Sequence, residues 1–261
     1  MSKTVFFDID GTIWDDDMVI PESTIEAVAA LKANGHLAFI CTGRARASVR
    51  SEKLLKMGFD GIIAACGNYI EMDGKVIYEN NLSADMVQKV IRVLSECKMP
   101  VVLEGSTDYW IDDEGFEDDP YVDYLFESLG EHAHIIRGYD GEIRINKFSA
   151  DVIDGTDYER VKTEFADDFL ILEHVENVVE FVPKGTSKAT GIKWLCNHLD
   201  IPLDETYAIG DSVNDLEMLE SVGHGIAMGN SMPPAKEIAE YVTSDISDDG
   251  VKNALKHYGL I

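Results

Sequence analysis

The feature that most constrains the fold is a short apolar run near the N-terminus that ends in two aspartates. Residues 5–7 read Val-Phe-Phe, and Asp8-Ile9-Asp10-Gly11-Thr12 follows at once. The run is too short and too apolar for an amphipathic helix, so it predicts a buried strand with both faces covered, as in a parallel sheet. Open α/β sheets bind ligands at the carboxyl ends of such strands. The sequence therefore places two carboxylates at a predicted binding edge.

These two aspartates predict a cation site. Asp8 and Asp10 are two residues apart, so strand geometry points both side chains the same way until the chain turns at Gly11. Like charges repel unless a cation or a shared proton intervenes, and a divalent metal is the simplest remedy. A plain Asp-Gly turn is the simplest alternative. A calcium loop is excluded, because counting from Asp8 the sixth position is Ile13 rather than glycine and the twelfth is Val19 rather than glutamate.

Composition limits the class of protein. The 261 residues suit one large domain or two ordinary ones, and 45% hydrophobic with 27% charged residues is typical of globular proteins. No apolar stretch is long enough to span a bilayer, and the N-terminus has no signal-peptide pattern. The net charge of -27 argues against nucleic acid or an anionic membrane as partner. Four cysteines without a C-x-x-C pair indicate reduced thiols in a cytoplasmic protein.

Two further predicted strands also end in polar residues. The run at residues 37–40 ends in Cys41-Thr42-Gly43-Arg44, and the run at 206–209 ends in Gly-Asp-Ser-Val-Asn-Asp at 210–215. A hydroxyl followed by glycine leaves the hydroxyl and the backbone N–H able to hold a phosphoryl oxygen. A helix predicted at about 45–57 would add its positive end. Each motif taken alone is also a serviceable strand–helix turn.

A lysine at a helix start is another candidate. Residues 183–188 read Pro-Lys-Gly-Thr-Ser-Lys, and Thr186 or Ser187 can cap the helix that follows. Lys188 falls in the first turn, where a positive charge opposes the helix dipole. A residue that breaks a local rule is a functional candidate. Lys184 is the rival, but it precedes the helix.

The order of predicted elements changes between about residues 82 and 182. Strands adjoin strands there, and no charged motif stands at a strand end, which favours a separate α+β module. We therefore predict a core formed by residues 1–81 and 184–261, with residues 82–183 inserted as a second domain. Several side chains able to bond to hydroxyls lie at or near strand ends of the insert: Glu104, Tyr109, Asn146 and Lys147.

Three local patterns give further predictions. Ser23 and Glu26 form a capping box for a helix that starts near Pro21. Residues 69–78 alternate around Asp73-Gly74 and predict a hairpin. A strand is predicted at 143–148, and Cys66-Gly67-Asn68 precedes the hairpin.

These motifs, in this order, resemble those of the haloacid dehalogenase (HAD) superfamily of phosphotransferases. Asp8 to Thr12 looks like motif one, Thr42 like motif two, Lys188 like motif three, and residues 210–215 like motif four. The Thr-Gly-Arg form at 42–44 is typical of the Cof-like branch, subfamily IIB. The resemblance implies a three-layer, Rossmann-like α/β core with a parallel sheet and an inserted α/β cap that governs substrate specificity.

The resemblance also implies a mechanism. Asp8 would attack phosphorus and form an aspartyl-phosphate, while Asp10 would protonate the leaving oxygen and then activate water. The implied cofactor is Mg²⁺, held by Asp8, the backbone carbonyl of Asp10, Asp211 and, through a water, Asp215. The phosphate-binding groups would be Thr42, Gly43, Lys188 and Asn214, with Arg44 steering the substrate.

The expected activity is that of a phosphoric monoester hydrolase that prefers phosphorylated sugars, with a sugar alcohol phosphate as a further option. The alternatives are a sugar-phosphate phosphomutase, a pyridoxal or flavin phosphate phosphatase, and a non-catalytic regulator that binds a phosphorylated ligand. A dehalogenase is disfavoured, because relatives of that kind lack the second aspartate and the magnesium. We expect a small-molecule phosphorylated substrate as partner, no nucleic acid or membrane, and a monomer or weak dimer.

Overall fold

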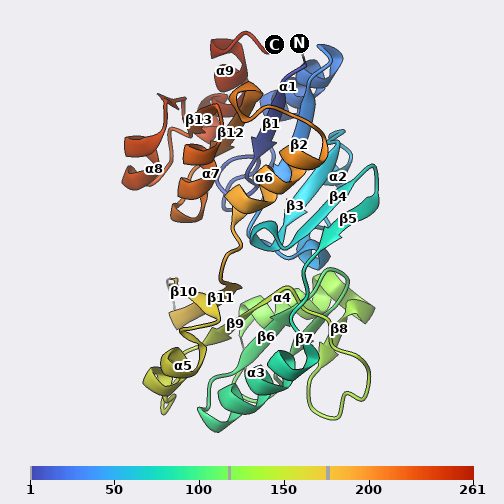
Figure 1. Cartoon of the computed structure of the whole chain (residues 1–261), viewed down its shortest axis with the longest axis vertical. Helices are drawn as coiled ribbons and strands as arrows, with labels where there is room; N and C mark the ends of the chain where they lie inside the picture. The colour runs from blue at the N-terminus through green and yellow to red at the C-terminus, as the bar shows by residue number, and fades with distance from the viewer. Residues whose placement is uncertain (1, 117–118, 175–176) are drawn as a thin grey trace. The chain divides into compact units, whose positions relative to one another are not determined.

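The apolar run at residues 5–7 forms a central strand of a large sheet. In the computed structural model, which describes residues 2–116, 119–174 and 177–261, β1 (Thr4–Phe7) lies inside an eight-stranded sheet of order β14-β13-β12-β1-β2-β3-β4-β5 (Figure 1). It pairs in parallel with β2 (Leu37–Cys41) on one side and β12 (Thr206–Gly210) on the other. All four residues of β1 are buried. The predicted buried parallel strand is confirmed.

Helices cover both faces of this sheet. Phe6 and Phe39 pack with Ile192, Leu195 and Met218 from two of the helices. Alternate strand residues point to the opposite face, where α1 and α9 contact each other. The further elements are β3 (Gly61–Ala64), β4 (Tyr69–Met72), β5 (Lys75–Glu79), β13 (His224–Ala227), β14 (Tyr241–Val242), α1 (Glu22–Ala33), α2 (Glu52–Leu55), α6 (Lys188–His198), α7 (Leu216–Ser221), α8 (Pro233–Ile238) and α9 (Gly250–His257). The predicted α/β class with a parallel sheet is confirmed.

By its internal contacts the chain forms two compact units. The larger comprises Met1–Gly43, Ser51–Tyr78 and Ser187–Ile261, and the smaller comprises Arg44–Arg50 and Glu79–Thr186. In Figure 1 the larger unit joins blue and cyan segments to orange and red ones, whereas the smaller is mainly green and yellow. The boundaries at 81–82 and 183–184, and the role of the insert as a cap, stay predictions.

The smaller unit is built on a six-stranded sheet of order β10-β11-β9-β6-β7-β8. Its core includes Phe148 and Phe181, whose rings stack with centroids 4.5 Å apart, packed with residues of α3 and α5. The elements are α3 (Ala84–Glu96), β6 (Val101–Glu104), β7 (Tyr109–Ile111), α4 (Pro120–Leu129), β8 (Ala133–Ile135), β9 (Lys147–Asp151), α5 (Tyr158–Phe165), β10 (Phe169–Glu173) and β11 (Val178–Pro183). Within the described ranges, no helix combines the length and apolar character needed to cross a membrane.

The helix predicted at about residues 45–57 is wrong. The chain forms a 3-10 turn at Arg46–Ser48, leaves helical geometry at Val49 (φ -84°, ψ 77°), and only then starts the short α2. Residues 44–50 take their contacts from the smaller unit, so tertiary packing overrides the local helical pattern. No α-helix N-terminus therefore follows Gly43 directly.

Two other local predictions are also wrong. Helix α1 starts at Glu22 with Pro21 at the N-cap, so Ser23 lies inside the first turn and its Oγ has no hydrogen-bond partner. Proline fixes φ at a value suited to a helix start, which sets the boundary before the expected capping box. The strand expected at 143–148 forms as β9 (Lys147–Asp151) instead.

The predicted hairpin and the predicted cap of α6 are confirmed. Strands β4 and β5 flank a turn in which Asp73 (φ 51°) and Gly74 (φ 70°) are both left-handed, as a tight hairpin requires. Ser187 accepts a hydrogen bond from the backbone N–H of Thr190, and the Thr190 hydroxyl accepts one from the Ser187 backbone. This capping box fixes where α6 begins.

Candidate active site

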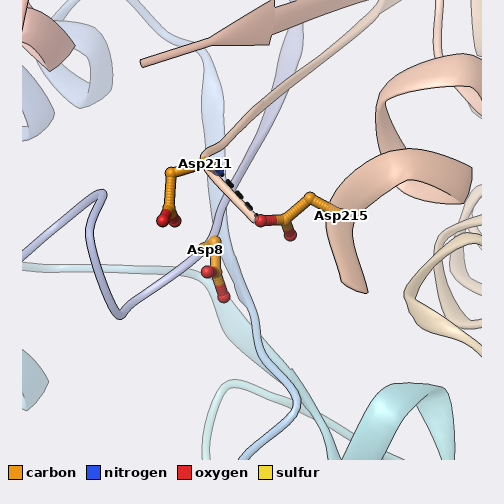
Figure 2. Close-up of side chains that lie close together, drawn as sticks. All are labelled: Asp8, Asp211 and Asp215. Atoms are coloured by element: carbon orange, nitrogen blue, oxygen red, sulfur yellow. Dashed lines mark hydrogen bonds between the residues drawn. The ribbon is translucent and has the colours of Figure 1, made fainter. Parts of the chain in front are cut away.

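Three aspartates converge at the carboxyl ends of β1 and β12. Asp8 follows β1 directly and is 4% exposed, and its backbone N–H donates to Ile209 O at 3.0 Å. Asp211 follows β12, the parallel neighbour of β1, and Asp215 lies four residues further on. Carboxylate oxygens of Asp8, Asp211 and Asp215 lie within 4.8 Å of one another, as Figure 2 shows. The parallel pairing thus joins residues about two hundred positions apart.

The turn after β1 is shaped to fit Asp211. Gly11 has φ 73°, and a Cβ at this position would lie 2.4 Å from Asp211 Oδ2. The hydroxyl of Thr12 donates to Asp211 Oδ1 at 3.3 Å. Glycine is therefore required both by the left-handed backbone and by the close approach of the carboxylate.

Lys188 lies among these carboxylates. Its Nζ donates to Asp8 Oδ1 at 2.7 Å, to Asp215 Oδ1 at 2.7 Å and to Asn214 Oδ1 at 3.0 Å. The side chain is 1% exposed and belongs to the first residue of α6, which the capping box at Ser187 fixes. The rival, Lys184, is exposed. The structure therefore brings Lys188, and not Lys184, into the cluster.

The cluster holds more negative than positive charge. When all three carboxyls are ionised, three carboxylates and one ammonium leave two negative charges, which is the charge that one divalent cation balances. Burial and the charge of Asp215 raise the pKa of Asp8 well above its usual value, although Lys188 opposes the rise. Burial and Asp215 likewise raise the pKa of Asp211 to about 7. Burial disfavours the Lys188 ammonium, but Asp215 and Asp8 outweigh it and raise the pKa of the lysine well above its usual value. The raised pKa values mean that, without a bound cation, Asp8, Asp211 and Lys188 hold their protons more tightly than usual.

The donor set fits Mg²⁺, a hard cation that prefers carboxylate oxygens and keeps several waters. Asp215 is already engaged, because its Oδ2 accepts from the backbone N–H groups of Asp211 at 3.0 Å (dashed in Figure 2) and Ser212 at 3.1 Å, while Oδ1 accepts from Lys188. These existing hydrogen bonds suit an Asp215 that contacts the ion through a water molecule. Asp8 and Asp211 would be the carboxylates that bind the ion directly.

Thr42 and Gly43 lie beside this cluster. Thr42 is 1% exposed, and its backbone is fixed by bonds from Thr42 N to Ile63 O at 2.8 Å and from Cys66 N to Thr42 O at 3.2 Å. A Cβ on Gly43 would lie 3.4 Å from Asn214 Nδ2. Asn214 therefore contacts the loop after β2 as well as Lys188, and the predicted phosphate-binding residues lie close together.

Two predicted site residues lie outside the three-aspartate group. Asp10 is exposed, and its Oδ1 accepts a hydrogen bond from Trp14 Nε1 at 2.8 Å. Arg44 is grouped with the smaller unit. Within that unit the charge of Arg44 acts on Tyr121. Desolvation raises the pKa of the Tyr121 phenol, and the positive charges of Lys147 and Arg44 oppose that rise.

A left-handed turn supports the start of α6, and the sequence pattern did not reveal it. Ala65 (φ 50°), Cys66 (φ 51°) and Gly67 (φ 84°) are consecutive left-handed residues. The buried Asn68 braces them, because its Nδ2 donates to Ala65 O at 2.8 Å. A Cβ on Gly67 would lie 2.3 Å from Ser187 O, so the turn abuts the N-cap of the helix that carries Lys188.

A second buried polar cluster lies in the smaller unit. Lys147 Nζ contacts Glu104 Oε2 at 3.3 Å and also hydrogen-bonds to Glu180. Tyr109 Oη donates to Glu104 Oε2 at 3.1 Å, and His174 Nε2 lies 3.0 Å from Glu180 Oε2. Glu104, Tyr109 and Lys147 were predicted as polar groups of the insert. Glu180 and His174 were missed, because no sequence pattern links β11 to β9 and β6 at this register.

This polar cluster is held by charge compensation. Burial opposes the charge on Glu180, but Lys147 and His174 outweigh it and lower the pKa of that carboxyl to about 2. Burial and Glu104 raise the pKa of the Tyr109 phenol well above its usual value. Asn146 does not join the cluster, since its Nδ2 donates to Asn80 O at 2.9 Å and Asn81 Oδ1 at 3.2 Å.

Comparisons with known proteins extend over the whole chain. A family model described as haloacid dehalogenase-like hydrolase matches residues 5–255. YkrA of Bacillus subtilis (strain 168), named only as a candidate phosphatase, is 34% identical over 277 residues, covering 100% of this chain and 99% of YkrA. 5-amino-6-(5-phospho-D-ribitylamino)uracil phosphatase YitU of the same strain is 28% identical, covering 97% and 96%. A solved structure described as a HAD subclass IIB sugar phosphatase matches with TM-score 0.80 and 26% identity over 100% of both chains.

Proposed function

Since the chain belongs to the haloacid dehalogenase-like hydrolases, of the Cof-like type, and is a phosphatase, we propose that it hydrolyses small sugar and sugar alcohol monophosphates through an aspartyl-phosphate on Asp8, with Mg²⁺ as cofactor. The observation that carries this proposal is the cluster of Asp8, Asp211 and Asp215 around one buried lysine. It offers a nucleophile, a cation site and a positive group for phosphate within hydrogen-bonding reach. Phosphoryl transfer needs mainly positioning and charge neutralisation.

The reaction divides into two displacements at phosphorus. In the first, a carboxylate oxygen of Asp8 bonds to phosphorus, the ester P–O bond breaks, and Asp10 gives a proton to the leaving oxygen. In the second, water bonds to phosphorus, Asp10 takes the water proton, and the bond to Asp8 breaks. Bound Mg²⁺ would be held by Asp8, Asp211, the Asp10 carbonyl and, through water, Asp215, and would neutralise phosphoryl charge.

The remaining groups bind the phosphoryl oxygens. Lys188 Nζ is 2.7 Å from Asp8 Oδ1, so a phosphoryl group on Asp8 would lie within reach of the ammonium. Thr42 and Gly43 supply a hydroxyl and a backbone N–H, and Asn214 orients Lys188. Arg44 follows Gly43 directly in the chain and would attract the anionic substrate.

The test of the covalent step is Asp8→Asn, which replaces the nucleophile by an isostere. We expect loss of turnover by about 10³-fold or more on any phosphate ester, with the fold retained. Asp73→Asn, an exposed aspartate in the hairpin turn of the same unit, serves as control and should keep wild-type rates. Substantial residual activity of purified Asp8→Asn would refute the aspartyl-phosphate, and a wild type without turnover would favour a regulator that only binds.

The metal proposal is tested by chelation. Excess chelator should abolish turnover and added Mg²⁺ should restore it, whereas Ca²⁺ should support little turnover because it takes more ligands at longer distances. Full activity in excess chelator would exclude the metal role of Asp8 and Asp211. A requirement for a sugar bisphosphate activator would instead indicate a phosphomutase.

For the substrate class, we propose that the polar cluster of the smaller unit selects the leaving group. Glu104 and Glu180 supply carboxylate oxygens beside the single ammonium of Lys147, and such acceptors suit the hydroxyl donors of a sugar. The cluster is linked to the phosphate-binding loop by the chain itself, because Ser48, six residues after Thr42, shares a side-chain hydrogen bond with Tyr109. The names of two of the similar proteins, which refer to a sugar phosphatase and to a phosphoribityl substrate, agree with this class.

The test compares Glu104→Gln with Glu114→Gln, an exposed glutamate of the same unit. We expect Glu104→Gln to raise KM for sugar and sugar alcohol monophosphates about 10-fold, as for the loss of one charge-assisted hydrogen bond, while p-nitrophenyl phosphate is unaffected. Glu114→Gln should behave as wild type. The proposal fails if both substrates change equally, or if pyridoxal phosphate exceeds every sugar phosphate in kcat/KM.

A further inference from the structure

The loop after β13 is bonded to both turns that carry the predicted metal ligands. Asn230 Nδ2 donates to Gly11 O at 2.7 Å in the turn after β1, and Met232 N donates to Asp211 O at 2.8 Å in the turn after β12. Strand β13 pairs in parallel with β12, so its carboxyl end lies at the same edge of the sheet as that of β12. The strand order β13-β12-β1 thus brings this loop against both turns.

The amide of Asn230 is fixed in one orientation by two backbone groups. Its Oδ1 accepts from Ile246 N at 3.0 Å, and its Nδ2 donates to Gly11 O at 2.7 Å. The amide oxygen can only accept and the amide nitrogen can only donate, so a backbone N–H on one side and a carbonyl on the other define which end faces Gly11. Ile246 is buried in the turn before α9, whereas Asn230 is exposed. The buried turn therefore holds the exposed side chain in place.

Gly11 is the point at which the turns after β1 and β12 come closest. A Cβ on Gly11 would lie 2.4 Å from Asp211 Oδ2, so the glycine backbone packs directly against that carboxylate. The next residue, Thr12, donates to Asp211 Oδ1 at 3.3 Å, and the residue before, Asp10, supplies the backbone carbonyl that we expect to bind Mg²⁺. Glycine has the widest choice of backbone conformations, so a hydrogen bond from outside the turn has most effect there. A rotation at Gly11 would displace the groups on both sides of it.

We propose that Asn230 is a positioning residue of the Mg²⁺ site, and that its hydrogen bond to Gly11 O keeps the Asp10 carbonyl and the Asp211 carboxylate in the arrangement that the ion needs. This inference rests on the proposed function. Asn230 acts through Gly11 and binds neither the ion nor the substrate. Mg²⁺ demands nearly ideal octahedral geometry, so a group that holds its ligands in place affects its affinity strongly.

The most informative variant is Asn230→Asp, which keeps the shape of the side chain. A carboxylate still accepts from Ile246 N, but it has no N–H to donate to Gly11 O. The turn would then sample more conformations before the ion binds, and ordering it would lower the affinity. The added negative charge would by itself attract a cation, so weaker binding of Mg²⁺ would have to come from the lost donor.

The experiment is calorimetric titration of the metal-free full chain with MgCl2 at one pH and ionic strength. Loss of a group that orients metal ligands typically costs about 10–100-fold in affinity, so we expect the Kd for Mg²⁺ to rise by about this factor in Asn230→Asp. The matched control is Asn34→Asp, because Asn34 is also exposed and its Nδ2 donates to a backbone carbonyl, Leu260 O, at 2.8 Å. Asn34 precedes β2 and so lies at the opposite edge of the sheet, and the control should keep the wild-type Kd.

An unchanged Kd in Asn230→Asp would overturn the inference and leave Asn230 a structural loop residue. Equal weakening in Asn34→Asp would also overturn it, because a lost hydrogen bond anywhere in the unit would then suffice. Asn230→Ala removes the donor without adding charge, and it must show the same weakening if Asn230→Asp does not fold.

Failure of this inference can be told apart from failure of the proposed function. A wild type that binds no Mg²⁺ would refute the cofactor proposal and this inference together. Unchanged affinity in Asn230→Asp, beside a wild type that binds Mg²⁺ and turns over phosphate esters, would refute this inference alone.

Discussion

Lys188 forms ion pairs with the carboxylates of both Asp8 and Asp215, and it is almost fully buried. Removing one partner of a buried ion pair leaves an uncompensated charge, which costs about 3–5 kcal/mol. We therefore expect Lys188→Met to lower the free energy of unfolding by about this amount without divalent metal, and to abolish turnover. Lys193→Met, at an exposed lysine on the same helix, should change the free energy of unfolding by less than about 0.5 kcal/mol. Equal urea midpoints for the two variants would contradict the charge balance described above.

Asp211 gives the chain a pH-dependent stability when metal is absent. Its pKa is about 7 in the folded chain and is near 4 when unfolded, so the folded state binds more protons between these values. The free energy of unfolding should therefore fall as pH rises from about 4 to about 7. Urea unfolding in chelator across this range measures the trend.

The control for this pH dependence is Asp211→Asn, which cannot titrate. The variant should lose that part of the dependence, while Asp73→Asn should keep it. Saturating Mg²⁺ should also reverse the trend in the wild type, because the ion binds the deprotonated carboxylate. A wild-type slope identical to that of Asp211→Asn would show that Asp211 titrates normally.

Strand-end carboxylates could be predicted from the sequence because a parallel sheet brings strand ends to one edge. Asp8 and Asp211 follow apolar runs, so their meeting follows from the pairing of β1 with β12. The hydrogen bond from Trp14 to Asp10 could not be predicted, because it depends on how a turn directs one indole. Glu180 and His174 were missed for a similar reason, since strand register in an inserted sheet is not visible locally.

At the scale of elements, α6 is held in place by close backbone contact with the turn at residues 65–67. A helix interior normally gains about 1 kcal/mol when glycine becomes alanine. At Gly191 the added Cβ would lie 2.7 Å from Ile63 Cγ2 and 2.9 Å from Gly67 Cα. Overpacking costs about 1–3 kcal/mol. This cost should exceed the gain in helix propensity, because one neighbour is backbone and the other is a buried branched side chain.

We therefore expect Gly191→Ala to destabilise the chain by about 1–2 kcal/mol and to lower kcat, because α6 carries Lys188. Thermal melting and steady-state kinetics measure the two effects. Lys193→Ala on the same helix is the control, and it should be near neutral because the residue is exposed. A stabilised Gly191→Ala variant would show that helix and turn can separate without cost.

The segment after Gly43 shows how tertiary packing can override a local sequence pattern. Its apolar spacing favours a helix over about 45–57, but residues 44–50 pack within the smaller unit and form only a 3-10 turn. By contrast, α4 (Pro120–Leu129) and α5 (Tyr158–Phe165) begin at a signal that is local in the sequence. In both of these helices an aspartate caps the first turn, so the local sequence alone defines the start.

On the scale of the whole molecule, the two units have separate hydrophobic cores, so they should unfold in separable transitions. Phe148 is fully buried in the core of the smaller unit, and Phe→Ala changes at such sites cost about 3–5 kcal/mol. We expect Phe148→Ala to shift the urea midpoint reported by Trp110, which lies in that core, and not the midpoint reported by Trp14 and Trp194. Fluorescence of variants that keep one or the other set measures this. Equal shifts would indicate a single cooperative unit.

The order of strands in the large sheet also affects how the chain can fold as it leaves the ribosome. β1 emerges early, but its neighbour β12 follows about two hundred residues later. Until then one edge of β1 offers unpaired backbone groups to other chains, as exposed strand edges do. The sheet residues of the smaller unit are contiguous in sequence and can pair first. A nascent chain can therefore contain a folded insert while the edge of β1 next to Asp8 is still unpaired and the active site is incomplete. We expect a chaperone to be most useful during this interval.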